Sequence, residues 1–357
     1  MNKIIVALDM GGCPNRCKHC WLGHFSNSHL RGNDLYYVAN EFRKITDNLE
    51  IVSWYREPDF LDNYKKLYEI ENKLSNSRTV SHFELLSFWR AVRDDQYIPW
   101  IKELGVNACQ LTLWGGREKT DYYTGRVGAY DEIIKTINIL LENKIAPRIQ
   151  ILMNKDNIND LKTIEETIIS LNLIDRCKEI GKEFSLFAHQ GSCDGENVKN
   201  YNIRITPEDI YLIPNLIIEY TLKHFNKSNI MDVFGYTEQV LFDKLVIDKN
   251  TINYVTENPV FYIDNKFNVY PNITNISIYW HLGNLKQDGV RRIMDNYINN
   301  KSMAQEISVT KPVCDLVQNN GNNNSIKLFL ENDYKIYLLN EFCKKNINKQ
   351  NQRITNG

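Results

Sequence analysis

The chain has 357 residues and a formal net charge of -1, with 43% hydrophobic and 24% charged residues. This composition excludes a disordered or fibrous protein, and the balanced charge gives no global field that would draw the chain to nucleic acid or to an anionic membrane. No stretch approaches the length of a membrane span, and the first apolar run is too short for a signal peptide. We therefore expect a cytoplasmic protein whose eight cysteines stay reduced.

Short apolar runs alternate with amphipathic segments over the first 225 residues. The pattern predicts strands at residues 4–10, 49–55, 82–87, 109–114, 148–153 and 184–189. It predicts helices between and after them at residues 34–46, 61–74, 97–104, 129–143, 157–171 and 207–224, with a loop after the fourth strand. Six such β/α units indicate an α/β protein with a parallel sheet covered by helices.

The pattern changes near residue 256. Residues 260–270 predict a hairpin with Asp264 and Asn265 in its turn, followed by a helix at residues 289–299. We therefore divide the chain into a core (1–225), a connector (226–255), a small α+β extension (256–343) and a polar tail (344–357).

Three cysteines follow the first strand directly, in the run Cys13-Pro-Asn-Arg-Cys17-Lys-His-Cys20. The residues between them are polar, so the run is a loop at the carboxyl end of a strand, where α/β folds place their chemistry. Thiolates are soft ligands for zinc, copper(I) or iron–sulfur clusters, and three of them leave one metal position open. Zinc would need a fourth ligand, which His19 or His24 could supply.

The motif resembles the signature of the radical SAM family, C-x3-C-x2-C with an aromatic residue before the last cysteine; His19 fills that place here. The resemblance implies a partial (β/α)6 TIM-like barrel over residues 1–225. It further implies that Cys13, Cys17 and Cys20 hold one [4Fe-4S] cluster and that S-adenosylmethionine (SAM) is the second cofactor. In this family SAM is reductively cleaved to methionine and a 5′-deoxyadenosyl radical, which abstracts hydrogen from the substrate.

Weaker matches to the family imply that Glu57, Thr112 and Asn154 contact SAM together with His19. The family's Gly-Gly-Glu-Pro segment is Tyr55-Arg56-Glu57-Pro58 here, so the glutamate is kept and both glycines are missing. A carboxylate at Glu57 would pair with the SAM ammonium group, although it also fits an exposed loop. Thr112 belongs to the fourth strand, and Asn154 follows the fifth, where asparagine also suits a helix-initiating turn.

The C-terminal segments 261–272, 280–285 and 311–314 resemble the SPASM or twitch extension of radical SAM enzymes. Asn272 and Val317 stand where that extension has cysteines, which implies that a second cluster is absent. The orphan thiols Cys314 and Cys193 are then candidate hydrogen-atom donors, which would make the reaction an epimerisation. The alternative is that both cysteines are incidental.

Three functions follow from these patterns. The first is a radical SAM enzyme acting on a small-molecule biosynthetic substrate, favoured because the first barrel strand begins at about residue 4 without a preceding leader-binding module. The second is a radical SAM maturase of ribosomal peptides. The third is a noncatalytic iron–sulfur or zinc-binding barrel that serves as a scaffold or sensor. The enzymatic alternatives imply an electron donor such as flavodoxin or ferredoxin.

Overall fold

The structure is a computed structural model that describes residues 2–10, 12–20, 22–23, 30–52, 60–76, 87–272 and 276–355, with the backbone alone from residue 348. Three sequence predictions lie outside these residues: Glu57, His24 and nearly all of the third strand, residues 82–87.

The other five expected core strands are present and parallel. They are β1 (Ile4–Leu8), β2 (Leu49–Val52), β3 (Ala108–Leu113), β4 (Ala146–Leu152) and β5 (Ser185–His189). β1 pairs with β2, and β4 pairs with β3 on one side and β5 on the other. Every residue of β1 is buried, as expected for a parallel strand covered on both faces.

Helices cover these strands with apolar stripes. In α6 (Ala129–Glu142), for example, Ile133, Ile137 and Leu140 recur at helical spacing and are fully buried against the core of β3 to β5. The remaining core helices are α1 (Gly32–Phe42), α2 (Tyr64–Leu74), α3 (Phe88–Ala91), α4 (Tyr97–Glu103), α5 (Arg117–Thr124), the 3-10 turn η2 (Ile158–Asp160), α7 (Leu161–Ser170), α8 (Leu173–Glu179), the 3-10 helix η3 (Gly195–Ile203), α9 (Pro207–Ile210) and α10 (Asn215–His224).

The C-terminal part continues the sheet that begins at β1. β7 (Val260–Ile263) pairs in parallel with β1, and it forms the predicted hairpin with β8 (Asn268–Tyr270). β9 (Gly283–Asn284) adds to β8. The other elements are α11 (Met231–Phe234), β6 (Tyr236–Thr237), α12 (Glu238–Leu245), the 3-10 turn η4 (Ile278–Trp280), α13 (Leu285–Ile298), α14 (Met303–Thr310), α15 (Val313–Asn320), β10 (Leu328–Phe329) and α16 (Glu331–Thr355).

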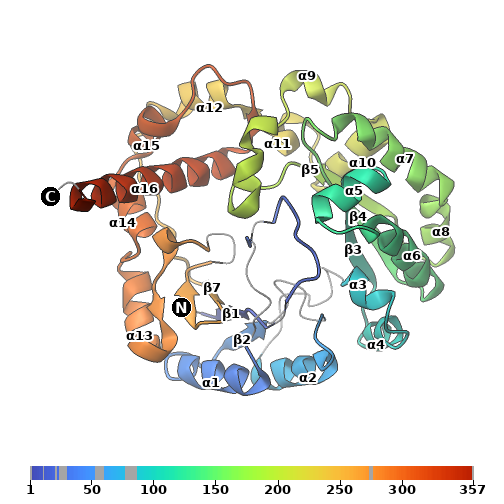
Figure 1. Cartoon of the computed structure of the whole chain (residues 1–357), viewed down its shortest axis with the longest axis horizontal. Coiled ribbons are helices and arrows are strands. Elements are labelled where there is room, and N and C mark those ends of the chain that lie inside the picture. The colour runs from blue at the N-terminus through green and yellow to red at the C-terminus, as the bar shows by residue number, and fades with distance from the viewer. Residues whose placement is uncertain are drawn as a thin grey trace.

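The elements form a ring in projection (Figure 1), with core helices along the bottom and right and the C-terminal helices α13 to α16 on the left. The chain after β1, dark blue where it is described, crosses the middle of this ring (Figure 1). In the described part of the chain, no helix is long and apolar enough to cross a membrane.

Two secondary-structure predictions were wrong, each for a local reason. The expected loop after β3 contains α5, because its glycines cap a helix at both ends instead of breaking it: Gly116 is the N-cap and Gly125 the left-handed C-cap. The expected helix at residues 207–224 is split into α9 and α10, since Pro214 lacks an amide hydrogen and its predecessor avoids helical geometry. The polar tail is helical as far as Thr355.

Candidate active site

The cysteine loop, residues 12–20, is anchored to neighbouring elements through its backbone. The amide groups of Arg16 and Lys18 donate to the carbonyl oxygens of Thr124 (2.8 Å) and Tyr123 (2.9 Å) at the end of α5. On the other side, the Cys20 carbonyl accepts from the amide of Glu196 at the start of η3 (2.8 Å). The loop is therefore suspended between α5 and η3 at the carboxyl end of β1.

Gly125 allows α5 to approach the loop this closely. Its φ is +67°, and a Cβ atom added to it would lie 2.7 Å from the carbonyl oxygen of Arg16. Glycine alone adopts such a conformation readily and leaves this space open.

Substitution of Gly125 by alanine should therefore destabilise the protein and loosen the loop. The left-handed conformation alone should lower the free energy of unfolding by about 1–2 kcal/mol, and the clash with Arg16 should add to it. Gly128→Ala is the matched control, because Gly128 has φ +82° but nothing within 4 Å of the added Cβ. Thermal unfolding and the alkylation rates of the loop thiols would check this; equal effects of the two substitutions would contradict it.

The loop supplies three half-exposed cysteine thiols, those of Cys13, Cys17 and Cys20. Among the described residues, no three His, Cys, Asp or Glu side chains converge on a point where one metal ion could sit. A zinc ion would need four donors around one centre, with sulfur at about 2.3 Å. A [4Fe-4S] cluster makes a different demand, because each thiolate ligates a different iron. Three thiolates on one anchored loop are the donor set that such a cluster takes.

A small pocket adjoins the loop. Its walls come from the ends of β3 and β4, from α5 and from η3, and they include His19, Trp114, Tyr123, Asn154, Asn197 and Arg204. His19 belongs to both the loop and the pocket, with its ring centre 4.8 Å from that of Trp114. Trp114 and Tyr123 lie nearly parallel, at 9°. The pocket thus combines aromatic faces with amide groups and one arginine.

Asn154 is fixed in the pocket wall by hydrogen bonds. Its Oδ1 accepts from the Tyr123 hydroxyl (3.1 Å) and from the amide of Asp156 (2.9 Å). The next turn is held by the buried Asn157, whose Nδ2 donates to the carbonyl oxygens at the ends of β3 and β4, each at 2.8 Å. Burial, strengthened by the contact with Asp156, raises the pKa of Tyr123. The Tyr123 hydroxyl therefore remains a proton donor at neutral pH.

Thr112 does not line this pocket. Its hydroxyl donates to Oε1 of Gln150 (2.8 Å) on the face of the sheet opposite the helix-covered core. That face carries a chain of polar contacts across β3, β4 and β5 that continues from Gln150 to Nε2 of His189 (2.6 Å). Burial, aided by His224 and Arg204, lowers the pKa of His189 to about 4, so His189 is neutral at physiological pH.

Charged groups are buried behind the pocket, around Arg204. Arg204 is 4% exposed, and Asp194 is 6% exposed. The Ser192 hydroxyl donates to Oδ1 of Asp194 (2.8 Å), whereas Oδ2 has no hydrogen-bond partner. Burial raises the pKa of Asp194 to about 7, despite the Ser192 hydrogen bond. Asp194 therefore changes charge near neutral pH inside the protein.

Asp194 should make stability fall as pH rises. Because its folded pKa of about 7 exceeds the ordinary value of 3.8, the folded state binds the proton more tightly than the unfolded state between these values. The free energy of unfolding of Asp194→Asn, relative to that of the native protein, should therefore rise by at most about 4 kcal/mol from pH 4 to pH 8. Chemical denaturation at several pH values would check this, with the exposed Asp295→Asn as control. A pH-independent difference would contradict it.

The two predicted hydrogen donors lie in different surroundings. Cys193 is 3% exposed and belongs to the loop between β5 and η3, close to Arg204. Burial raises its pKa to about 12, so it stays a thiol. Cys314 is half-exposed at the start of α15, where its Sγ lies 3.9 Å from Oδ1 of Asp315. Neither cysteine lines the pocket.

The structure thus brings His19 and Asn154 together beside the cysteine loop and leaves Thr112 and Cys314 apart from them. Sequence reasoning missed Asn197, Arg204 and the role of Trp114. A usable signal existed for Trp114, which ends a predicted strand, where the chemistry of α/β barrels is concentrated. Asn197 and Arg204 lie well beyond the end of the last predicted strand and had no such signal.

Comparison with known families decides between the remaining assignments. Residues 8–171 match the Radical SAM superfamily. These residues form a radical SAM domain. Radical SAM proteins use a [4Fe-4S] cluster and SAM, so the family match agrees with the donor set of the loop. No curated protein matches the chain.

Solved structures extend the likeness beyond the radical SAM domain. The chain is similar to "Native anSMEcpe with bound AdoMet" (TM-score 0.55, 13% identity) and to the same protein with bound AdoMet and the Cp18Cys peptide (TM-score 0.53, 13% identity); each match covers 99% of both chains. A weaker likeness, with TM-score 0.47 and 11% identity, is to Streptococcus suis SuiB bound to the precursor peptide SuiA, over 82% of this chain and 64% of the other. At 13% identity the likeness establishes the fold, a partial barrel with its C-terminal part, and leaves the substrate open.

Proposed function

We propose that this radical SAM enzyme holds one [4Fe-4S] cluster on Cys13, Cys17 and Cys20, and that it cleaves SAM to modify a small-molecule biosynthetic substrate. The observation that carries the proposal is the position of His19, which belongs to the cysteine loop and also lines the adjoining pocket. A cluster on the loop and a nucleoside in the pocket would therefore be neighbours. When both are bound, the cluster supplies one electron, and the carbon–sulfur bond of SAM breaks to give methionine and a 5′-deoxyadenosyl radical.

The chain's own residues would bind and orient SAM. His19 and Trp114 offer aromatic faces suited to adenine, and Asn154 offers an amide held in place by Tyr123. Glu57, which lies outside the described residues, is proposed to pair with the SAM ammonium group. Thr112 is a weaker candidate for a SAM contact, because its hydroxyl is already bonded to Gln150. The buried rings of Trp114 and Tyr123 would help to exclude water, which protects a radical from quenching.

The same proposal assigns a role to each part of the chain. Residues 1–225 would form the catalytic core, residues 226–255 a connector, and residues 256–343 an extension without a cluster that closes the core, with a tail at 344–357. Asn272 and Val317 lack the thiols that a second cluster would need. A flavodoxin or ferredoxin would supply the electrons.

An epimerisation is the outcome that Cys193 supports. The substrate radical would take a hydrogen atom from the Cys193 thiol on the opposite face, leaving a sulfur radical that one electron and one proton from the reductant restore. The high pKa of Cys193, set by burial, keeps the thiol hydrogen in place. Cys314 has less support, since it lies in α15, whereas Cys193 lies close to Arg204 of the pocket wall. Deuterium from solvent should enter the product, and this label should vanish in Cys193→Ala but persist in Cys314→Ala.

The direct test is anaerobic reconstitution with iron, sulfide, SAM and dithionite. We expect about four iron atoms per chain and formation of 5′-deoxyadenosine. About eight iron atoms would defeat the single-cluster assignment. Iron uptake without any SAM cleavage would instead support a noncatalytic scaffold or sensor. Label transfer from deuterated candidate peptides to 5′-deoxyadenosine would favour a peptide maturase over a small-molecule enzyme.

A further inference from the structure

The cysteine loop has a third anchor, provided by a side chain inside the motif. Asn15, between Cys13 and Cys17, is 5% exposed. Its Oδ1 accepts a hydrogen bond from Nε of Arg126 (2.9 Å), which belongs to the segment joining α5 to α6. The contact spans 111 residues of sequence and is separate from the backbone bonds to Thr124 and Tyr123.

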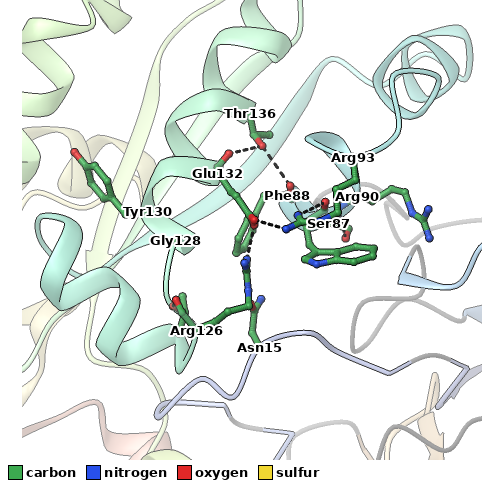
Figure 2. A network of polar contacts seen from close by, with 12 residues as sticks. Asn15, Ser87, Phe88, Arg90, Arg93, Arg126, Gly128, Tyr130, Glu132 and Thr136 are labelled. Atoms are coloured by element: carbon green, nitrogen blue, oxygen red, sulfur yellow. Dashed lines mark hydrogen bonds and ion pairs between the residues drawn. The ribbon is translucent and has the colours of Figure 1, made fainter.

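Arg126 is oriented by a second partner, Glu132, as Figure 2 shows. Its Nη2 donates to Oε2 of Glu132 (2.6 Å), and the other carboxylate oxygen of Glu132 accepts from Nη2 of Arg93 (2.5 Å). The three side chains and Asn15 thus form a chain of amide, cation, anion and cation between the cysteine loop and α6 (Figure 2). The guanidinium of Arg126 also lies over the ring of Phe88, 5.5 Å from its centre.

The charge pattern keeps Arg126 in one orientation. Burial alone would raise the pKa of Glu132, but hydrogen bonds from Arg93 and Arg126 lower it. Glu132 therefore stays ionised, and its place in the first turn of α6 suits a negative charge. Only 18% of the Arg126 side chain and 17% of the Glu132 side chain are exposed, so water competes little with this pair.

The planar guanidinium group of Arg126 donates hydrogen bonds to two partners at once, Asn15 and Glu132. Nε points to Asn15 and Nη2 points to Glu132, which a lysine ammonium could not match with the same fixed geometry. The segment carrying Arg126 is fixed in turn by Asp121, whose carboxylate accepts from the amides of Gly128 (2.7 Å) and Tyr130 (2.9 Å). We call the contacts from Asn15 through Arg126 and Glu132 to Arg93 the relay. The relay therefore connects the N-terminus of α6 to the centre of the C-x3-C spacer.

We propose that Arg126, oriented by Glu132 and Arg93, is a positioning residue that sets the conformation of the Cys13 to Cys17 segment through Asn15. The inference rests on the proposed function in one respect only, that these cysteines bind a cluster. Arg126 would hold the spacer in its cluster-binding shape before the cluster arrives, so that its loss affects loop order and cluster retention more than overall stability.

Four variants test the relay. Arg126→Gln and Asn15→Ala remove the central hydrogen bond, whereas Asn15→Asp keeps an acceptor for Arg126 and should preserve it. Arg176→Gln is the matched control, because Arg176 makes the same kind of contact, from Nη1 to Oδ1 of Asn138 (3.0 Å), on α8. All four proteins are first compared by thermal unfolding.

The first measurement uses the cluster-free protein and hydrogen exchange of the peptide covering residues 12–20. Exchange should be about tenfold faster or more in Arg126→Gln and Asn15→Ala, the factor expected for the loss of a charge-assisted hydrogen bond. It should remain native-like in Asn15→Asp and Arg176→Gln. Unchanged exchange in Arg126→Gln and Asn15→Ala would overturn the proposal, even if their melting temperatures fell.

The second measurement follows the reconstituted protein, by the rate of iron loss to a chelator and by the EPR spectrum of the reduced cluster. Arg126→Gln and Asn15→Ala should lose iron severalfold faster and give a broader spectrum, while Asn15→Asp restores both properties. Native retention in every variant would refute the positioning role in cluster binding. If the native protein itself acquires no iron, the proposed function fails, and the exchange experiment still decides whether the relay orders the loop.

Discussion

Replacing Cys17 with alanine is expected to lower 5′-deoxyadenosine formation by more than about 100-fold, since changes to groups that only hydrogen-bond to metal ligands already reach that range. Cys17 lies at the centre of the motif and packs with the pocket residues Trp114 and Tyr123. If the proposed assignment holds, loss of its thiolate removes one of three cluster ligands and leaves two. Cys13→Ala and Cys20→Ala should behave in the same way.

The informative control is Cys177→Ala. Cys177 is buried in α8, and burial raises its pKa to about 11, so it is a neutral packing residue. This variant should lose some stability and keep both its iron and its SAM cleavage. Iron content, visible absorbance and 5′-deoxyadenosine would be measured on the same anaerobic samples. Full activity in Cys17→Ala, or equal losses in Cys17→Ala and Cys177→Ala, would refute the cluster assignment.

The parts of the site that could be predicted from sequence are those encoded locally. The cysteine motif directly follows β1, whose five apolar residues predict a buried strand unambiguously. His19 lies within the motif, and Asn154 lies at a strand end, so their place beside the loop follows from the rule that parallel strands gather their carboxyl ends at one edge. The hairpin formed by β7 and β8 also has a local signal, the turn residues Asp264 and Asn265.

The parts that could not be predicted depend on contacts between distant segments. Asn15 reads as an ordinary turn residue, and only the fold brings Arg126 to it. The glycines around α5 read as loop formers, because sequence alone does not distinguish a helix cap from a break. Thr112 was expected at a SAM site on family resemblance, but its hydroxyl bonds to Gln150 from the neighbouring strand, a pairing fixed by the sheet register.

Arg204 was likewise missed, and its removal is expected to have the largest effect on stability. The Arg204 side chain joins the pocket wall to the C-terminal part of the chain. Its Nε donates to the carbonyl oxygen of Leu328 (3.0 Å), its Nη1 donates to that of Gly191 (3.3 Å), and its guanidinium lies 3.9 Å from the centre of the Phe329 ring. Arg204 also lowers the pKa of Asp333, which burial raises. Arg204 therefore attracts the half-buried Asp333 carboxylate and satisfies two carbonyl groups at once.

Arg204→Leu should lower the free energy of unfolding by about 1–3 kcal/mol at pH 8, the range found when buried polar groups lose their hydrogen-bond partner. The loss should be smaller at pH 5, because Asp333 without its cation takes up a proton more readily and the buried charge disappears. Adding Asp333→Asn should recover part of the loss at pH 8, which a double-mutant cycle would quantify.

Arg43→Leu is the control, since Arg43 is exposed and also donates to a carbonyl oxygen, that of Leu74 (3.0 Å). If Arg204→Leu were equally harmful at both pH values and Asp333→Asn gave no recovery, the loss would come from packing against Phe329 and not from charge. SAM affinity and iron content would also be measured for Arg204→Leu. Weaker SAM binding with unchanged iron content would show that Arg204 acts in the pocket wall and not through the cysteine loop.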